Sequence, residues 1–256
     1  MSALEIHQIP VLSDNYVYLL RDVASGDTAV VDPSLSAPVL KAAADLGLRL
    51  THVLNTHHHW DHTGGNLDIK DATGCKVVGA LADADRIPGL DIALDDGEVF
   101  TLGASEAKVI MVPGHTSGHV AYWFQDASAL FSGDTLFSLG CGRLFEGSAA
   151  QMWRSLRTLR ELPDQTQVYC GHEYTLANAK FAISVDPDNE VLRTRLAEVE
   201  ALRARRQPTV PSLMATERAA NPFLRADDPA LKARLGMGSA DAARVFGEIR
   251  RRKDAF

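Results

Sequence analysis

The 256-residue sequence predicts an α/β protein whose sheets are covered by helices and whose last part is helical. Two observations lead to this fold class. Up to residue 173, short segments rich in aromatic and β-branched residues alternate with segments of helical pattern. Beyond that point only helical patterns follow one another. The hydrophobic share of 46% and the charged share of 23% are those of an ordinary globular protein, which excludes the disordered and fibrous classes.

The individual elements follow from local patterns and turn residues. Strands are predicted at residues 16–21, 28–31, 52–55, 76–78, 98–101, 108–112, 120–124, 129–131 and 167–169. A helix over residues 36–48 contains Gly47 near its end, which is typical of a helix C-cap, and a second helix lies around residues 150–162. After residue 173, helices are predicted at 174–183, 190–206, 227–235 and 240–252, with proline or glycine between them.

The segment Thr56-His57-His58-His59-Trp60-Asp61-His62 holds four imidazoles and one carboxylate, the ligands of zinc, iron and manganese. Alternate side chains of an extended backbone point the same way, so His57 and His59 can reach one ion together. Asp61 and His62 follow where the chain turns and can hold a second ion. Gly64 and Gly65 are expected to give that turn its freedom and to leave room over the metals. The alternative is a histidine-rich surface loop with weak metal affinity.

Four predicted strands end in the same way. In each, an apolar strand is followed by a small residue and then by His or Asp; the ligands so placed are His57, His115, Asp134 and His172. Ligand sites at the carboxyl ends of strands are the usual arrangement in layered α/β proteins. The recurrence predicts a metal centre assembled from several strands.

Four motifs carry a family resemblance: the segment 56–62, Gly114-His115-Thr116, Ser132-Gly133-Asp134-Thr135 and Gly171-His172-Glu173-Tyr174-Thr175. Together they resemble the metallo-β-lactamase superfamily. Within it, the chain is similar to the hydroxyacylglutathione hydrolase (glyoxalase II) family. The segment Asn221-Pro222-Phe223-Leu224-Arg225 and residues 250–254 extend this resemblance to the end of the sequence.

The resemblance implies a fold and a metal centre. The expected fold is a four-layer αββα sandwich over residues 1–173, the catalytic domain, followed by an all-α substrate-binding domain over residues 174–256. His57, His59 and His115 are expected to hold one metal ion, and Asp61, His62 and His172 a second, with Asp134 bridging both. Two divalent ions are expected, zinc first, with iron or manganese as the other options. A hydroxide shared by such a pair, oriented by Asp61, would attack a thioester carbonyl.

The implied activity is hydrolysis of S-(2-hydroxyacyl)glutathione, typified by S-D-lactoylglutathione, to glutathione and D-lactate, the second step of methylglyoxal detoxification. Arg143, Tyr174, Arg250 and Lys253 match positions that bind glutathione in this family, and cationic side chains suit its two carboxylates. The family pattern would have Lys at 143 and Tyr at 145. Phe145 lacks that hydroxyl, which puts one hydrogen bond of about 1 kcal/mol in doubt.

Charge and cysteine content bear on partners and location. Residues 1–173 carry a net charge of −11 and residues 174–256 one of +4, which suits a small anionic ligand and speaks against nucleic acid. No apolar run approaches the roughly 20 residues that span a bilayer, and residues 1–10 lack the pattern of a targeting signal. Three widely spaced cysteines fit reduced thiols. We therefore expect a cytoplasmic monomer with no membrane or nucleic-acid partner.

Other activities remain as alternatives at this point. A glutathione persulfide dioxygenase would use a single iron held by two His and one Asp, and a non-catalytic binding module would have lost ligands. A β-lactamase, lactonase or nuclease of the same superfamily would lack the helical segment or carry different additions. Four further histidines are excluded from the metal site. His58, between two ligands, is expected to point the opposite way and support the loop, and His119 is expected to orient a ligand. His7 and His52 have no motif around them and are expected to be structural.

Overall fold

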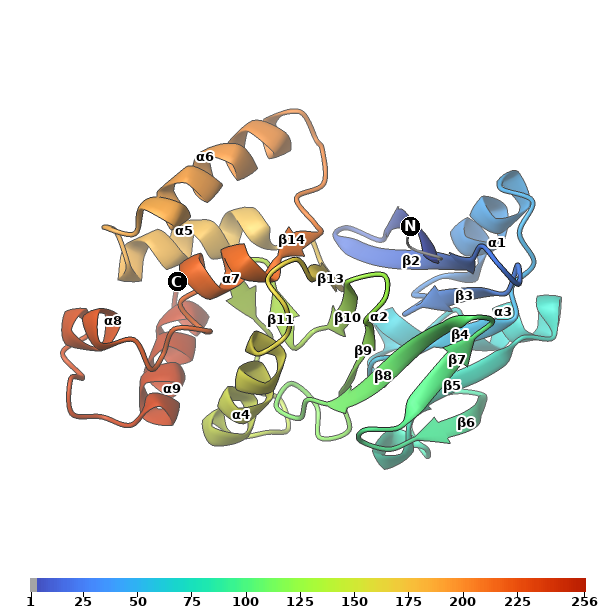
Figure 1. The fold of residues 1–256 in the computed structure, drawn as a ribbon, viewed down its shortest axis with the longest axis horizontal. Helices are drawn as coiled ribbons and strands as arrows, with labels where there is room; N and C mark the ends of the chain where they lie inside the picture. Colours follow the sequence, from blue (N-terminus) through green and yellow to red (C-terminus); the bar gives the residue numbers. More distant parts are fainter. Residues whose placement is uncertain (1–3) are drawn as a thin grey trace. The chain divides into compact units, whose positions relative to one another are not determined.

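The computed structural model describes residues 4–256 (Figure 1). The chain forms two compact units, and each is interrupted in sequence. The first unit runs up to Met111 and resumes over Ser117–Gly133, and the second consists of Val112–Thr116 and Asp134–Phe256. These units divide the chain at other places than the expected domain boundary after residue 173, which stays a prediction.

The first unit contains a six-stranded mixed sheet in the order β1-β2-β3-β4-β5-β6. β1, β2 and β3 pair antiparallel, and β3 to β6 pair parallel. The strands are β1 (Leu4–Val11), β2 (Asn15–Asp22), β3 (Thr28–Val31), β4 (His52–Leu54), β5 (Lys76–Ala80) and β6 (Leu90–Leu94). Parallel pairing brings the carboxyl ends of β3, β4 and β5 to one edge of the sheet, where the loop with the four imidazoles begins.

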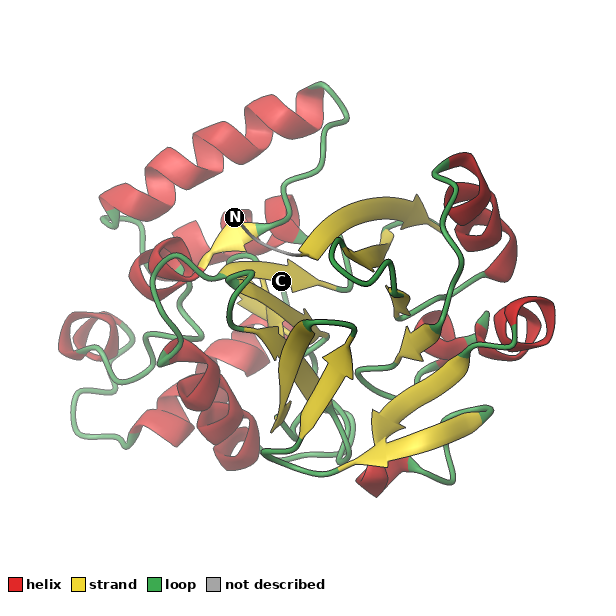
Figure 2. Cartoon of the chain, turned by 45° about the vertical axis from the view of Figure 1, so that its right-hand side comes forward, coloured by secondary structure: helices red, strands yellow, loops and turns green. Residues whose placement is uncertain are grey.

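Two helices cover one face of this sheet (Figures 1 and 2). They are α1 (Ser36–Asp45) and α3 (Asn66–Thr73), and one turn of helix, α2 (Trp60–Thr63), precedes α3. The apolar side chains between the helices and the sheet are buried and include Val17, Leu19, Val30, Val39, Val53, Ile69 and Val77. α1 ends three residues before the predicted position because Gly47 adopts a φ of 66°, the left-handed conformation that closes a helix.

A second, antiparallel sheet covers the opposite face of the first. In the first unit it runs in the order β10-β9-β8-β7, formed by β7 (Val99–Leu102), β8 (Ser105–Met111), β9 (Val120–Phe124) and β10 (Ala129–Gly133). The aromatic rings of Tyr18 on β2 and Phe131 on β10 lie 5.5 Å apart between the sheets, and Phe124 packs edge-on against Phe131. Helices, mixed sheet and antiparallel sheet therefore form three successive layers of the first unit.

A buried carboxylate also ties the two sheets of the first unit together. Asp22 at the end of β2 accepts hydrogen bonds from the Ser105 hydroxyl at 2.6 Å and from the Ser25 amide at 2.7 Å. Burial by itself raises the pKa of Asp22, but the hydrogen bonds from Ser105 and Ser25 outweigh it and hold the pKa at about 2. The ionised carboxylate therefore stabilises the fold at pH values above about 4, the pKa of aspartate in an unfolded chain. This contribution is lost as the pH falls toward 2.

We expect Asp22→Ala to lower the free energy of unfolding by about 2 kcal/mol at pH 7, because the change leaves the buried Ser105 hydroxyl and the Ser25 amide without their acceptor. The difference between variant and unsubstituted protein should shrink between about pH 4 and pH 2. Urea unfolding at pH 7 and pH 3 measures it. A difference that is the same at both pH values would show that the ionised carboxylate is not the stabilising group.

The second unit is mainly helical. Its helices are α4 (Ala149–Arg160), α5 (Thr175–Val185), α6 (Glu190–Ala204), α7 (Met214–Ala220), α8 (Pro229–Arg234) and α9 (Ala242–Asp254). Two short strand pairs accompany them: the hairpin of β11 (Leu136–Phe137) and β12 (Gly140–Cys141), and the pair of β13 (Gln167–Cys170) and β14 (Ser212–Leu213). The side chains of Ser148, Asn189, Asp228 and Asp241 cap the N-termini of α4, α6, α8 and α9.

The helices of the second unit are joined by aromatic side chains. Phe223, in the segment after α7, lies 6.0 Å from the ring of Phe181 on α5 and 5.9 Å from that of Phe246 on α9. Trp153 on α4 packs on the same Phe246. Within residues 4–256, no helix is long and apolar enough to cross a membrane.

Candidate metal centre

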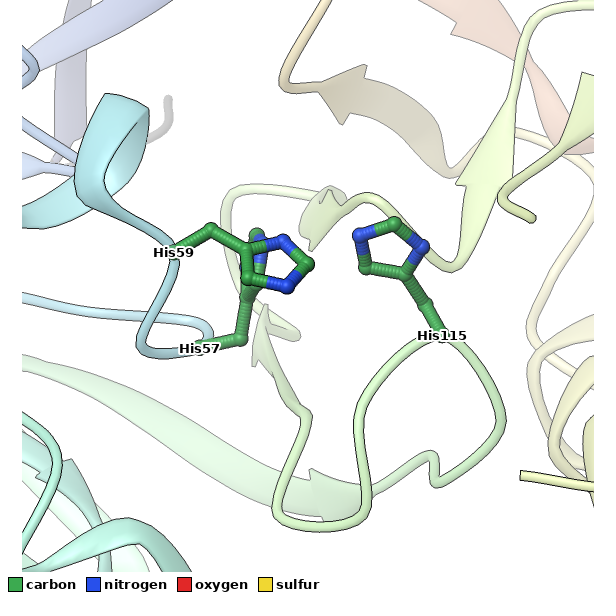
Figure 3. Close-up of side chains that lie close together, drawn as sticks. All are labelled: His57, His59 and His115. Atoms are coloured by element: carbon green, nitrogen blue, oxygen red, sulfur yellow. The ribbon is translucent and has the colours of Figure 1, made fainter. Parts of the chain in front are cut away.

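The loop that follows β4 places two imidazoles together. His57 is fully buried, and its Nε2 lies 3.1 Å from Nδ1 of His59. Figure 3 shows the two rings side by side on this loop. Thr56 fixes the start of the loop, since its amide and its hydroxyl both donate to the carboxylate of Asp32, at 2.8 and 2.7 Å. Two ring nitrogens that face each other at this distance suit a shared cation.

Asp61 and His62 lie on the single turn α2 that continues this loop. His62 Nε2 is 3.5 Å from Asp61 Oδ2, and the rings of His57 and His62 lie 4.2 Å apart. Asn15 holds Asp61 in place, because its amide donates to Asp61 Oδ2 at 3.0 Å. The first unit thus gathers the four predicted ligands of the segment 56–62 into one group.

The two glycines after α2 serve a different purpose from the one expected. Neither has a positive φ. A Cβ on Gly64 would lie 2.6 Å from the Ser34 carbonyl oxygen, and one on Gly65 would lie 2.8 Å from the Pro33 carbonyl oxygen. The expectation that they give the turn freedom was therefore wrong: the glycines allow the loop after β3 to approach α2 closely.

Asp32 is a candidate site residue that sequence reasoning missed. Its Oδ2 lies 3.1 Å from Nδ1 of His62, and ligand atoms of Asp32, His57 and His62 lie within 4.8 Å of one another. Because the carboxylate already accepts two bonds from Thr56, its position suits a residue that orients His62 through Nδ1 and leaves Nε2 to face a metal. The signal was present in the sequence: the strand at 28–31 also ends in an acidic residue, followed by Pro33.

Two of the histidines excluded from the metal site, His58 and His119, lie beside the predicted ligands of the segment 56–62. His58 Nδ1 lies 2.9 Å from Oδ2 of the buried Asp83, so its ring supports the loop. His119 stacks on His57 with ring centroids 4.6 Å apart and planes inclined by 16°. Its position beside a predicted ligand suits an orienting role.

In the second unit, His115 is held in a defined tautomer. Its Nδ1 lies 2.9 Å from the Arg143 carbonyl oxygen. A carbonyl only accepts, so Nδ1 carries a proton, and Nε2 is the ring nitrogen left to face a metal. Gly114 has a φ of 155°, and a Cβ there would lie 2.7 Å from Cβ of Met152, so only glycine fits before this histidine. Figure 3 shows His115 on its own loop.

Asp134 stands between the two histidines of the second unit. Its Oδ2 lies 3.5 Å from Nε2 of His115 and 3.3 Å from Nε2 of His172. The ring of Tyr174 stacks on His172, with centroids 4.7 Å apart and planes inclined by 3°. One carboxylate oxygen that faces two imidazole nitrogens has the arrangement expected of a ligand shared by two ions.

The predicted substrate-binding residues gather near this second group. Arg143 is exposed. The pKa of Lys253 is lowered by burial and by the nearby positive charges of Arg250 and Arg143. Arg250 is only 6% exposed; its guanidinium donates to the Cys141 carbonyl at 2.9 Å and to Asp254. Phe145, 62% exposed, lies edge-on to the His115 ring at 5.1 Å.

The chemistry of the donors fits borderline divalent ions. All seven predicted ligands offer imidazole nitrogen or carboxylate oxygen, the set that zinc, iron and manganese share. The cysteines of the chain are buried and form no disulfide. Burial raises the pKa of Cys141 to about 11 and that of Cys170 to about 12, so neither offers a thiolate near neutral pH.

Comparisons with known proteins agree with this chemistry. Residues 12–172 match the family model of the metallo-β-lactamase superfamily, and residues 173–256 match that of the hydroxyacylglutathione hydrolase C-terminus. The chain is 62% identical to a hydroxyacylglutathione hydrolase of Methylococcus capsulatus over 99% of both chains. It is 59% identical to one of Rhodospirillum rubrum over the full length of both.

Solved structures share the fold. ETHE1 from Myxococcus xanthus superposes with a TM-score of 0.71 at 26% identity, covering 96% of this chain and 90% of that one. TTHA1623, solved in a di-iron-bound form, gives a TM-score of 0.56 at 27% identity, covering 66% of this chain and 91% of that one. The predicted fold class, a metallo-β-lactamase fold with a helical C-terminal part, is confirmed. The chain therefore belongs to the hydroxyacylglutathione hydrolase family of the metallo-β-lactamase superfamily and is a thioester hydrolase.

Proposed function

We propose that this enzyme hydrolyses S-(2-hydroxyacyl)glutathione, with S-D-lactoylglutathione as the typical substrate, to glutathione and D-lactate. This reaction is the second step of methylglyoxal detoxification, which we place in the cytoplasm. The observation that carries the proposal is the carboxylate of Asp134, which faces His115 and His172 in the unit that also brings the cations Arg143 and Lys253 close to each other. Hydrolysis of a thioester of an anionic tripeptide needs metal ligands for the reaction and cations that bind the carboxylates of the substrate.

In this proposal two divalent ions, zinc in the first place, bind per chain. His57, His59 and His115 would hold one, Asp61, His62 and His172 the other, and Asp134 both. The donor types support this assignment, as does the di-iron-bound form of a similar protein. When bound, such a pair supplies a hydroxide near neutral pH and withdraws electrons from the thioester carbonyl.

The residues of the chain orient the reactants. Asp61 is proposed to accept a hydrogen bond from the attacking water, and Asn15 and Ser34 fix its position through its carboxylate and its carbonyl. Asp32 and Arg143, through its backbone carbonyl, fix the rings of His62 and His115. These contacts are formed before substrate arrives, so no reorganisation is needed when the carbonyl is attacked.

Glutathione is proposed to lie against Arg143, Tyr174 and Lys253, the more accessible members of the predicted substrate set. Arg250 is proposed to attract the anionic substrate through its positive charge. Its guanidinium also donates to the carbonyl of Cys141, two residues before Arg143. Phe145 offers an exposed apolar face close to His115 in place of a phenol hydroxyl. The domain of residues 174–256 would then bind substrate, while that of residues 1–173 would supply all seven metal ligands.

We expect Lys253→Ala to raise KM about tenfold with little change in kcat, because it removes a charge-assisted hydrogen bond to a substrate carboxylate far from the reacting carbonyl. Steady-state kinetics with S-lactoylglutathione measure the change. Lys180→Ala, an exposed lysine on α5 of the same unit, is the matched control and should leave KM unaltered. An unchanged KM in Lys253→Ala would place the glutathione site elsewhere.

The same lysine predicts a pH dependence. Burial and the charges of Arg250 and Arg143 lower the pKa of Lys253, so its ammonium loses its proton at a lower pH than an ordinary lysine. The KM of the unsubstituted enzyme should therefore rise toward that of Lys253→Ala as pH increases through the alkaline range, while the KM of the variant stays flatter. Parallel pH profiles for both proteins would contradict this.

The proposed activity is tested on purified protein whose metal content has been measured. Loss of the thioester absorbance together with release of one thiol per substrate would support it. Oxygen uptake with glutathione persulfide and no turnover of S-lactoylglutathione would identify a persulfide dioxygenase instead. Tight binding of glutathione without turnover of either compound would identify a binding module.

A further inference from the structure

The hairpin of β11 and β12 connects two parts of the proposed site. It begins two residues after Asp134 and ends two residues before Arg143, with Ser138 and Leu139 between its strands. The two strands are joined by only two residue pairs, Leu136 with Cys141 and Phe137 with Gly140. So short a hairpin is not stable by itself, and the rest of the unit must hold it.

Side chains of α7 and of the residue after it supply backbone contacts at this hairpin. The amide of Asn221 donates to the carbonyl of Phe137 at 3.3 Å and to that of Gly140 at 3.0 Å. The Glu217 carboxyl accepts from the backbone N–H of Leu139 at 2.8 Å and from the side-chain amide of Asn221 at 3.0 Å. Each of the two side chains thus contacts both the hairpin and the other side chain.

α5 holds the same turn from another direction. The amide of Asn178 donates to the Ser138 carbonyl at 3.1 Å, and a Cβ on Gly140 would lie 2.4 Å from that amide. Leu139 has a φ of 56°, a left-handed conformation that is unfavourable for leucine, and its side chain is fully buried against Ala179 and Ala182 of α5. The turn keeps this conformation because its surroundings determine it.

The burial of these groups needs an explanation. Glu217 and Asn221 are both 0% exposed, and a buried carboxyl is costly unless it is hydrogen-bonded. An apolar pair would be buried at this position at lower cost. It would leave the carbonyls of Phe137 and Gly140 and the amide of Leu139 without these partners. The polar pair therefore serves the hairpin.

We propose that Glu217, Asn221 and Asn178 are positioning residues of the enzyme, which hold the β11–β12 hairpin so that Asp134 and Arg143 keep their places. This inference rests on the proposed function, since it takes Asp134 as a metal ligand and Arg143 as a substrate contact. In this proposal the helices of the second unit bind glutathione and also hold the segment that carries Asp134 and Arg143.

The test uses three substitutions in the full-length enzyme. Asn221→Asp keeps the shape and places an acceptor against two carbonyls, and Asn178→Ala removes one contact at the rim of the hairpin. Glu217→Gln keeps an oxygen that can accept from Leu139 and is the conservative rescue. Glu200→Gln on α6, at an exposed position, is the matched control for loss of one negative charge.

Hydrogen exchange of the peptide 134–143 is measured first, on each variant, by mass spectrometry. We expect Asn221→Asp to accelerate it about tenfold and Asn178→Ala by a smaller factor, while exchange in β8 and β9 stays unchanged. Glu217→Gln and Glu200→Gln should stay close to the unsubstituted protein. Unchanged exchange in both Asn221→Asp and Asn178→Ala would overturn the proposal.

Kinetics separate positioning from general stability. Asn221→Asp is expected to raise KM for S-lactoylglutathione about fivefold and to lower the metal content, because Arg143 and Asp134 both lose their fixed positions. A lower Tm with unchanged KM and unchanged metal content would show a merely structural role and overturn the proposal. If the unsubstituted enzyme does not hydrolyse the thioester, the proposed function fails, and the exchange measurement still decides whether these side chains hold the hairpin.

Discussion

The Asp134→Ala variant is expected to lose kcat/KM by at least about a thousandfold, equivalent to ~4 kcal/mol of transition-state stabilisation, and to retain less metal. Asp134 Oδ2 faces Nε2 of His115 at 3.5 Å and Nε2 of His172 at 3.3 Å. Alanine leaves both imidazoles without the anion they share. Two cations held close together depend on such an anion, so we expect the second equivalent of metal to be lost first.

Activity with S-lactoylglutathione and metal content by elemental analysis measure this prediction. Asp126→Ala is the matched control, because Asp126 lies exposed in the turn that joins β9 to β10, eight residues before Asp134. A folded Asp134→Ala protein that keeps two equivalents of metal would remove Asp134 from the ligand set. One that keeps full activity would contradict the proposed function itself.

The Asp32→Ala variant is expected to bind metal about 10- to 100-fold more weakly and to lose about 3 kcal/mol of unfolding free energy. Asp32 accepts from the amide and hydroxyl of Thr56 and faces Nδ1 of His62, all in buried surroundings. Without it, the ring of His62 is free to rotate, and two donors of Thr56 are left without an acceptor.

Asp32→Asn separates the two effects. Asparagine tolerates the φ of 51° at this position and keeps one oxygen for the Thr56 amide, so most of the stability should return. Metal affinity should stay low, because the amide cannot accept from both Thr56 and His62. Competition with a chelator and urea unfolding report the two quantities, and the exposed Asp71 on α3 provides the control Asp71→Ala. Equal metal affinity in Asp32→Asn and the unsubstituted protein would contradict an orienting role.

Much of the fold was predictable because strands with β-branched and aromatic runs are locally determined. Residues 28–31 and 120–124 form strands within the predicted bounds. β1 and β6 were missed, since the sequence Leu-Glu-Ile-His-Gln-Ile of β1 mixes polar and apolar residues at a sheet edge. α3 was missed as well, because Asn66–Thr73 has a weak apolar stripe and is helical through the packing of Ile69.

The candidate site was predictable where its residues follow strands directly, as His57 and His115 do, because a ligand after an apolar strand is visible in the sequence. Glu217 was not predictable. It stands in an ordinary helical pattern, and its burial depends on the Leu139 amide, which lies 78 residues earlier in the chain. Such pairings are set by tertiary structure, on which local composition gives no information.

The position of the His115 loop in the sequence affects when this loop can become ordered during synthesis. Residues 112–116 belong to the second unit, yet they precede strands β9 and β10 of the first. The carbonyl of Arg143 that binds His115, and the hydroxyl of Ser155 that donates to Pro113, lie 28 and 42 residues further along. On the ribosome the strands on both sides of the loop emerge and can pair first. We therefore expect His115 to become ordered only after residues 143 and 155 have been synthesised.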